Sequence, residues 1–183
     1  MSSGMTIPDA LSAVLPQAGQ SQAIIEYLPD KRPRILTAGQ LWDEVGGFAQ
    51  RLTEWGIGNR DKTAVFLENS IEFIEIFLAL LLINAVPVIA QLEYRKLELD
   101  EVFSNVQPQA VIAEGYHTEI LRPYLADRLV IERRNREFHA VQNGTGFAAG
   151  AELPAETASI HYTYRGHGYP LGALAPHAQF LNG

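Results

Sequence analysis

The sequence contains no cysteine in its 183 residues. Disulfide bonds and thiolate metal sites are therefore excluded, and the absence is typical of a cytoplasmic protein. Basic residues are also scarce, with 14 Lys and Arg against 21 Asp and Glu and a formal net charge of −7. Because general nucleic-acid binding needs a surplus of Lys and Arg to neutralise phosphates, this composition argues against a nucleic-acid partner.

A long uninterrupted apolar run is missing as well. The most apolar segment, residues 76–90, follows Glu72 and Glu75 closely and is interrupted by Asn84 and Pro87. A membrane span needs about 20 apolar residues, so we predict a buried helix running into a buried strand and no transmembrane segment. The N-terminus has no basic patch followed by a long apolar stretch, so we do not expect a secretory signal there.

The residues that are present predict a layered α/β domain. Apolar strand-like runs alternate with amphipathic helical patterns, which is typical of a largely parallel sheet flanked by helices. We predict strands at residues 23–29, 61–69, 85–92, 110–114, 128–133 and 157–164. The chain is expected to be one partial domain with the following parts: a lead-in at residues 1–20, an α/β core at 21–133, a loop at 134–156, and a strand, glycine-rich loop and short helix at 157–183.

Helix signals are clearest after residue 36. Thr37 is placed to cap a helix, and apolar residues then recur at steps of three and four on one face: Leu41, Val45, Phe48, Leu52 and Trp55. Gly46 and Gly47 weaken this helix, which suggests that another part of the chain packs closely there. Asn69 or Ser70 can cap the next helix. A third helix is expected near residues 96–107, with the side chains of Leu97, Val102 and Phe103 facing the core.

The remaining polar residues carry weaker signals. Glu72 and Glu75 have helical spacing and are expected at a solvated helix edge. His117 and His139 are expected in surface loops, and His177 at the start of the last helix, near Ala175. Neither the spacing of metal ligands nor a Ser-His-Asp order is present.

The stretch HYTYRGHGYPLG, residues 161–172, is the best candidate for a binding site. Gly166, Gly168 and Gly172 allow backbone N–H groups to approach an anion, and Pro170 stiffens the exit from the loop. A lone glycine-rich loop is also compatible with a plain turn between a strand and a helix.

Three stretches together resemble the acyl-adenylate-forming enzymes, the AMP-dependent synthetase and ligase superfamily. Residues 36–92 and 99–114 have the order of helices and strands found in the N-terminal region of that family. Residues 162–183, YTYRGHGYPLGALAPHAQFLNG, resemble its phosphate loop, Y-T-S-G-[ST]-T-G-x-P-K-G followed by His and a helix. The matching positions are Tyr162, Thr163, Gly168, Pro170, Gly172 and His177.

The loop also departs from the family pattern. Tyr164 and Arg165 stand where the family has serine and glycine, Gly166 and His167 where it has hydroxyl residues, and Leu171 where it has lysine. Since the glycine spacing survives while the positive charge has moved, we expect Arg165 to grip phosphate in place of the lysine. The later family motifs and the catalytic lysine are not in this sequence, so no catalytic residue is assigned.

The resemblance implies that ATP with Mg²⁺ activates a carboxylic acid, possibly a fatty acid, as an acyl-adenylate for transfer to coenzyme A or a carrier protein. It implies a nucleotide-binding set that consists of Thr163, Arg165, Gly166, His167, Gly168 and Gly172. We expect these 183 residues to be inactive on their own. Two alternatives stay open: a non-catalytic nucleotide-binding or interaction module, with a protein partner on the face that the rest of the large domain covers in full-length relatives, and an incomplete gene product.

Overall fold

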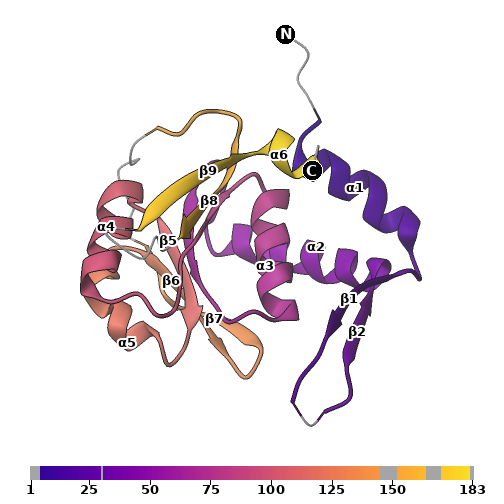
Figure 1. Cartoon of the computed structure of the whole chain (residues 1–183), viewed down its shortest axis with the longest axis horizontal. Coiled ribbons are helices and arrows are strands. Elements are labelled where there is room, and N and C mark those ends of the chain that lie inside the picture. The colour runs from indigo at the N-terminus through magenta and orange to yellow at the C-terminus, as the bar shows by residue number, and fades with distance from the viewer. Residues whose placement is uncertain (1–4, 30, 145–151, 164–169, 182–183) are drawn as a thin grey trace.

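Seven strands form the central sheet, in the order β7-β6-β5-β3-β4-β8-β9 (Figure 1). The structure is a computed structural model, and it describes residues 5–29, 31–144, 152–163 and 170–181. The inner strands β6, β5, β3, β4 and β8 run parallel, and β7 and β9 pair antiparallel at the two edges. The bounds of the strands are β3 Lys62–Phe66, β4 Val86–Ile89, β5 Ala110–Glu114, β6 Leu129–Arg134, β7 Glu137–Gln142, β8 Thr157–Thr163 and β9 Leu171–Pro176. The predicted α/β class with a largely parallel sheet is confirmed.

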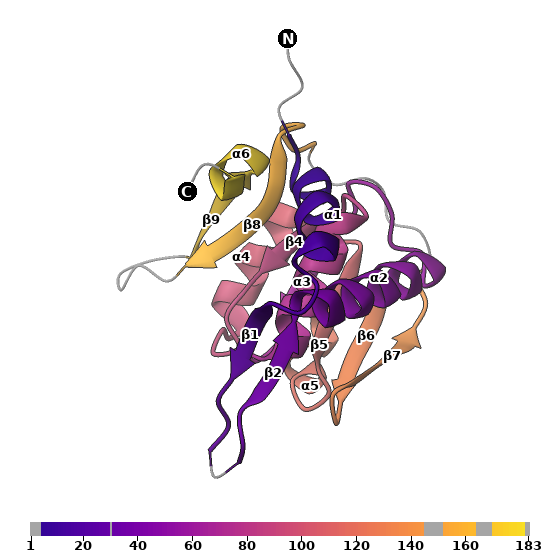
Figure 2. The same cartoon turned by 90° about the vertical axis from the view of Figure 1, so that its right-hand side faces the viewer.

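Helices cover both faces of this sheet (Figure 2). α2 (Ala38–Glu54) and α3 (Ile71–Leu82) pack on the face that contains Val65. α4 (Lys96–Val106) and α5 (Thr118–Leu121) pack on the face that contains Ala64 and Phe66. Successive residues of β3 thus point to opposite faces and every one is buried, as expected for an inner strand of a parallel sheet.

The remaining elements lie around this core. They are α1 Ile7–Ala18, β1 Gln22–Glu26, β2 Arg34–Thr37, the 3-10 helix η1 Arg122–Tyr124 and α6 His177–Leu181. β1 and β2 form a separate antiparallel hairpin that extends away from the main sheet (Figures 1 and 2). No helix among the described residues is long and apolar enough to cross a membrane. The apolar segment at residues 76–90 forms the end of α3 and the strand β4, as predicted.

Helix α2 forms as its sequence predicts. The Thr37 hydroxyl accepts a hydrogen bond from the Gln40 backbone N–H at 3.2 Å, and the Gln40 side chain accepts one from the Thr37 N–H at 2.9 Å. This reciprocal pair satisfies two donors that the first helical turn leaves without partners. The glycine pair inside α2 differs from expectation: a Cβ atom added at Gly46 or Gly47 would meet nothing within 4 Å. Among the described residues, the predicted close packing against these glycines is therefore wrong.

Three local predictions need correction. Leu97 is 60% exposed, and Leu99 is the α4 leucine that is buried with Val102 and Phe103. The segment 134–156, predicted as a loop, contains the edge strand β7, whose burial is confined to Phe138. The segment after the glycine-rich loop, predicted to begin a helix near Ala175, forms strand β9 first, and α6 begins at His177.

Candidate nucleotide-binding site

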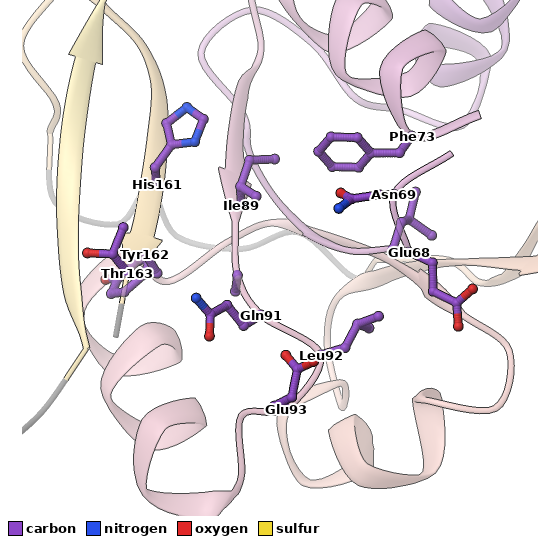
Figure 3. A pocket seen from close by; sticks show the side chains of 12 residues that line it. Glu68, Asn69, Phe73, Ile89, Gln91, Leu92, Glu93, His161, Tyr162 and Thr163 are labelled. Atoms are coloured by element: carbon purple, nitrogen blue, oxygen red, sulfur yellow. The ribbon is translucent and has the colours of Figure 1, made fainter. Parts of the chain in front are cut away.

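A cavity of about 440 Å³ lies at the carboxyl ends of β3, β4 and β8 (Figure 3). Strand β3 lies between β4 and β5, so the chain leaves it in one direction to form β4 and returns to its other side to form β5. In open α/β sheets, ligands bind outside the carboxyl ends of the strands near such a reversal. The lining residues are Leu67, Glu68, Asn69, Phe73, Ile89, Ala90, Gln91, Leu92, Glu93, His161, Tyr162 and Thr163.

The structure brings one member of the predicted phosphate-binding set into this cavity. Thr163 is the last residue of β8, is exposed and lines the cavity. Arg165, Gly166, His167 and Gly168 lie outside the described residues, so their predicted role stays a prediction.

Gly172 lies in β9 directly opposite Tyr162 of β8. Its φ angle is not in the left-handed region, so the backbone conformation alone does not require glycine here. A Cβ atom at this position would lie 2.9 Å from Cζ of Tyr162. The residue therefore makes room for the Tyr162 ring, and burial of that ring raises the pKa of its hydroxyl.

The described lining residues have an acidic character. Glu68 and Glu93 are exposed carboxylates at the cavity, and none of the described lining residues is Lys or Arg. The Tyr116 hydroxyl donates a hydrogen bond to Glu68 Oε1 at 2.6 Å, and this bond raises the pKa of Tyr116 to about 12. An anionic ligand in this cavity would need positive charge from elsewhere.

A buried ion pair supports the turn that forms one wall of the cavity. The Glu68 backbone N–H donates to Glu114 Oε1 at 3.1 Å, and Arg133 Nη1 lies 3.2 Å from the same oxygen. Arg133 Nη1 also donates to Ser70 Oγ at 2.8 Å. Ser70 in turn accepts a hydrogen bond from the Phe73 N–H at 3.2 Å and so caps α3, as predicted for the Asn69-Ser70 pair. Strands β5 and β6 thereby hold both the turn and the start of α3 in place.

His161 is a cavity residue that the sequence did not single out. Its Nε2 lies 2.9 Å from Ser159 Oγ, and its ring centroid lies 6.2 Å from that of Phe77 and 6.3 Å from that of Phe180. Burial lowers its pKa, which favours a neutral imidazole at pH 7. The sequence pattern that could have indicated His161 is the period of two along β8. It places His161 on the same side of the strand as Ser159 and the predicted site residue Thr163.

The other histidines also differ from expectation or refine it. His117 was expected in a surface loop, but it is buried, with its ring centroid 5.8 Å from that of Phe66. Burial, followed by the charge of Arg95, lowers its pKa. His139 is exposed but lies in strand β7. His177 begins α6, and its Nδ1 accepts a hydrogen bond from the Ile7 N–H at 3.2 Å, which links the last helix to α1.

The expectation that Glu72 and Glu75 lie at a solvated edge is wrong, since each is 3% exposed. Both face a second, smaller cavity of about 230 Å³ between α2, α3 and the β7 strand, with Arg34 and Arg136 beside them. Within the described residues, no group of three or more His, Asp or Glu side chains could hold a metal ion.

Comparison with known proteins identifies the family. The model of the family described as "AMP-binding enzyme" matches residues 14–182, which is most of the chain. The chain belongs to the AMP-binding enzyme family. The resemblance predicted from residues 36–92, 99–114 and 162–183 is thereby confirmed.

Two relatives illustrate the kinship of this AMP-binding chain. A medium/long-chain-fatty-acid–CoA/3-oxocholest-4-en-26-oate–CoA ligase from Mycobacterium tuberculosis is 25% identical over 188 residues, which covers 91% of this chain and 34% of that protein. A pseudomonine synthase from Pseudomonas entomophila is 34% identical over 103 residues, which covers 56% of this chain and 16% of that protein. The chain thus spans about a third of the length of the first relative and less of the second.

Solved structures share the fold. The fatty acyl-adenylate ligase from L. pneumophila, in complex with acyl adenylate and pyrophosphate, superposes with a TM-score of 0.72 at 16% identity, over 97% of this chain and 31% of that one. VinN in complex with L-aspartate gives a TM-score of 0.72 at 21% identity, over 95% of this chain and 48% of that one. At these identities the likeness establishes the shared fold.

Proposed function

We propose that this chain forms the phosphate-binding part of a ligase that uses ATP to activate a carboxylic acid as an acyl-adenylate. Transfer of the acyl group to coenzyme A or a carrier-protein thiol would follow. The observation that carries the proposal is the position of Thr163, where the chain leaves β8 at the carboxyl edge of the sheet and enters the segment that leads to β9. A glycine-rich segment at this edge, in a chain of the AMP-binding family, is well placed to meet a nucleotide.

In this proposal the segment from Thr163 to Gly172 holds the β- and γ-phosphates of ATP. Thr163 offers a hydroxyl, the backbone N–H groups of Gly166 and Gly168 offer donors, and His167 is a further donor. Arg165 supplies the positive charge that the family takes from a lysine, where this chain has Leu171. The acidic character of the described lining residues makes such a cation necessary, since pyrophosphate carries several negative charges as it leaves.

Mg²⁺ would accompany the nucleotide. The described cavity residues offer the oxygen donors that Mg²⁺ prefers, in the carboxylates of Glu68 and Glu93 and the hydroxyl of Thr163. When bound, the ion would neutralise phosphate charge. Because no group of three described acidic or histidine side chains is close enough to hold a metal alone, the phosphates would have to complete its coordination.

For the acid, we propose a fatty acid. The support comes from two relatives: the mycobacterial protein is a ligase of medium- and long-chain fatty acids and of 3-oxocholest-4-en-26-oate, and the L. pneumophila protein is a fatty acyl-adenylate ligase. None of the described cavity residues is assigned a catalytic role. We therefore expect the 183 residues alone to bind nucleotide without releasing pyrophosphate.

Isothermal titration calorimetry with ATP and Mg²⁺ tests the nucleotide proposal on the full chain. We expect Arg165→Ala to weaken binding by about 10- to 100-fold, which corresponds to the loss of one hydrogen bond to a charged group. Arg122→Ala is the matched control, since Arg122 is exposed, pairs with Glu119 and is not among the described residues that line the candidate cavity. Equal affinity of the wild type and Arg165→Ala for ATP would contradict the role of Arg165. If the wild type does not bind ATP at all, the nucleotide proposal is wrong.

The second candidate function is a non-catalytic nucleotide-binding or interaction module. The replacement of the family lysine by Leu171, which is 52% exposed, favours it. A pyrophosphate-release assay with fatty acids and ATP, applied to a protein that contains these residues together with the later family motifs, separates the two functions. Turnover supports the ligase, and nucleotide binding without turnover supports the module.

A further inference from the structure

The smaller cavity, of about 230 Å³, has the buried carboxylates of Glu72 and Glu75 in its wall. Among the described lining residues, it has none in common with the candidate nucleotide-binding cavity. Within the described part of the chain, neither Glu72 Oε2 nor Glu75 Oε1 has a hydrogen-bond partner. A buried acceptor without a donor is unfavourable, and more so when it is charged. A ligand that donates hydrogen bonds here would relieve this cost.

The charges around Glu75 are mostly negative. Burial raises the pKa of Glu75 to about 7. The charges of three neighbouring carboxylates, Glu44, Glu72 and Glu26, act in the same direction. Arg34 acts against them, but its guanidinium donates a hydrogen bond to Glu72. A cation beside Glu75 would therefore meet more attraction than repulsion from these neighbours.

The cavity also has an aromatic wall. The buried rings of Phe48 and Phe138 line it and pack edge to face, with their centroids 5.2 Å apart. The Arg51 guanidinium lies over the Phe48 ring, 4.2 Å from its centroid, so a cation already rests on this surface. Since a water molecule in the liquid takes up about 30 Å³, the cavity has room for an ammonium group with a short hydrocarbon chain.

We propose that this cavity, the Glu75 cavity, binds a small alkylamine in its protonated form. The ammonium group would donate to the Glu75 carboxylate, with Glu72 adding negative charge one helical turn away. The hydrocarbon chain would lie against Phe48 and Phe138. An ammonium suits the site because it combines a positive charge with three N–H donors, whereas a water molecule would supply a donor and leave the charge unbalanced.

Two further observations favour an organic cation at Glu75. A metal ion fits less well, because no group of three or more His, Asp or Glu side chains in the described ranges could hold one. The unbalanced carboxylate also lowers the stability of the folded chain, and local features of this kind are expected mainly at functional sites. Bound ammonium would return that stability by binding the folded state alone.

Binding should depend on the charge of Glu75. The charged groups around the Glu75 cavity are Glu26 of β1, Arg34 of β2, Glu44 and Arg51 of α2, Glu72 of α3, Arg133 of β6, Arg136 between β6 and β7, and Glu137 of β7. The arginines keep their charge at every pH at which the protein folds. The ionised carboxylate of Glu75 holds the ammonium, so the affinity should rise as pH rises through about 7.

Chemical-shift titration of the ¹⁵N-labelled full chain with butylammonium chloride tests the proposal. We expect saturable shifts at residues 72–76 at pH 8, and about 10-fold weaker binding at pH 6, where about a tenth of the carboxyl is ionised. Glu75→Gln should weaken binding at pH 8 by about 10- to 100-fold, since it removes a hydrogen bond to a charged group. This variant has no charge to bury, so unfolding would not explain the loss.

Glu119→Gln is the matched control, because Glu119 is exposed, pairs with Arg122 and is not among the described residues that line the Glu75 cavity. It should bind butylammonium like the wild type. Tetramethylammonium chloride at the same ionic strength carries the same charge without an N–H group, and it should cause much smaller shifts.

Four results would overturn the proposal. They are equal shifts with both salts, unchanged binding by Glu75→Gln, the absence of saturable shifts in the wild type, and binding that appears only in Arg51→Gln. The last result would mean that in solution Arg51 turns from Phe48 onto Glu75 and occupies the site itself.

Discussion

The carboxylates of Glu72 and Glu75 lie about one turn apart on α3, are equally buried, and have opposite electrostatic surroundings. Glu72 forms an ion pair with Arg34, and Arg133 Nη2 and Arg136 Nε lie 3.8 and 3.9 Å from its oxygens. Among the described residues Glu75 has no such ion pair, and its buried Oε1 lacks a hydrogen-bond partner, as does Oε2 of Glu72. One helix thus contains a buried carboxylate that is neutralised and another that is not.

Replacing Glu75 with glutamine should stabilise the protein, and the gain should grow with pH. Burial raises the pKa of Glu75 to about 7 from 4.5, and the nearby carboxylates Glu44 and Glu72 add to the rise. The folded state therefore holds this proton more tightly than the unfolded state, so wild-type stability falls as pH rises from about 4.5 through 7. Glutamine has no charge to bury. We expect the free energy of urea unfolding to favour Glu75→Gln by about 1–3 kcal/mol at pH 8, and by much less at pH 5.

Glu119→Gln is the control for that comparison, because Glu119 is exposed and its removal should leave the pH dependence of stability as in the wild type. If wild type and Glu75→Gln lose stability in parallel between pH 5 and 8, the carboxyl of Glu75 is not the buried group that titrates there.

The same substitution at Glu72 should have the opposite sign. Burial pushes the pKa of Glu72 upward, but the hydrogen bond and charge of Arg34 outweigh burial and hold it below its usual value. Glu72→Gln would leave Arg34, Arg133 and Arg136 without their shared anion. Since these arginines are partly exposed, we expect a loss on the order of 2 kcal/mol, which is less than for a fully buried pair. Urea unfolding at pH 7 measures this loss of stability. If Glu72→Gln is as stable as the wild type, hydration of the three arginines replaces their interaction with Glu72.

These two residues also show where sequence-based prediction ends. Their helical spacing was clear, but burial depends on residues of β2, β6 and the β6–β7 turn, which are far away in the sequence. His117 was missed for the same reason, because it packs on Phe66 of β3. By contrast, the cap at Thr37 and the buried face of α2 depend on neighbours within a few residues, and both were predicted.

The edge strands were missed for a different reason. β7 buries only Phe138 among its first five residues, so its sequence lacks the apolar alternation of a half-buried strand. β9 consists mainly of small and proline residues, and its pairing with β8 is what makes it a strand. At the candidate site, the sequence located the glycine-rich loop, whereas Glu68, Glu93 and His161 became apparent only when the ends of β3, β4 and β8 were brought together.

Helix α2 offers a route to higher stability. Gly46 and Gly47 lie inside the helix, and an added Cβ would meet nothing within 4 Å at either position. Alanine should therefore stabilise each site by about 0.5–1 kcal/mol, because it reduces the backbone freedom of the unfolded chain. Thermal unfolding of the two single variants and the double variant checks this. Destabilisation by alanine would reveal a contact with a residue outside the described part of the chain.

Gly172→Ala should have the opposite effect, although the φ angle of Gly172 is not left-handed. The new Cβ would lie 2.9 Å from Cζ of the buried Tyr162 ring, and the antiparallel pairing of β8 with β9 restricts the ring's escape. We expect a loss of about 1–3 kcal/mol, which is typical of an overpacked contact. A double-mutant cycle identifies the cause: in a Tyr162→Ala background, Gly172→Ala should cost little, because the ring is gone. Gly46→Ala is the control for an alanine without a neighbour. If Gly172→Ala lowers stability equally in both backgrounds, the clash with the Tyr162 ring is not the cause. The backbone of β9 or of the adjoining segment would then require the glycine.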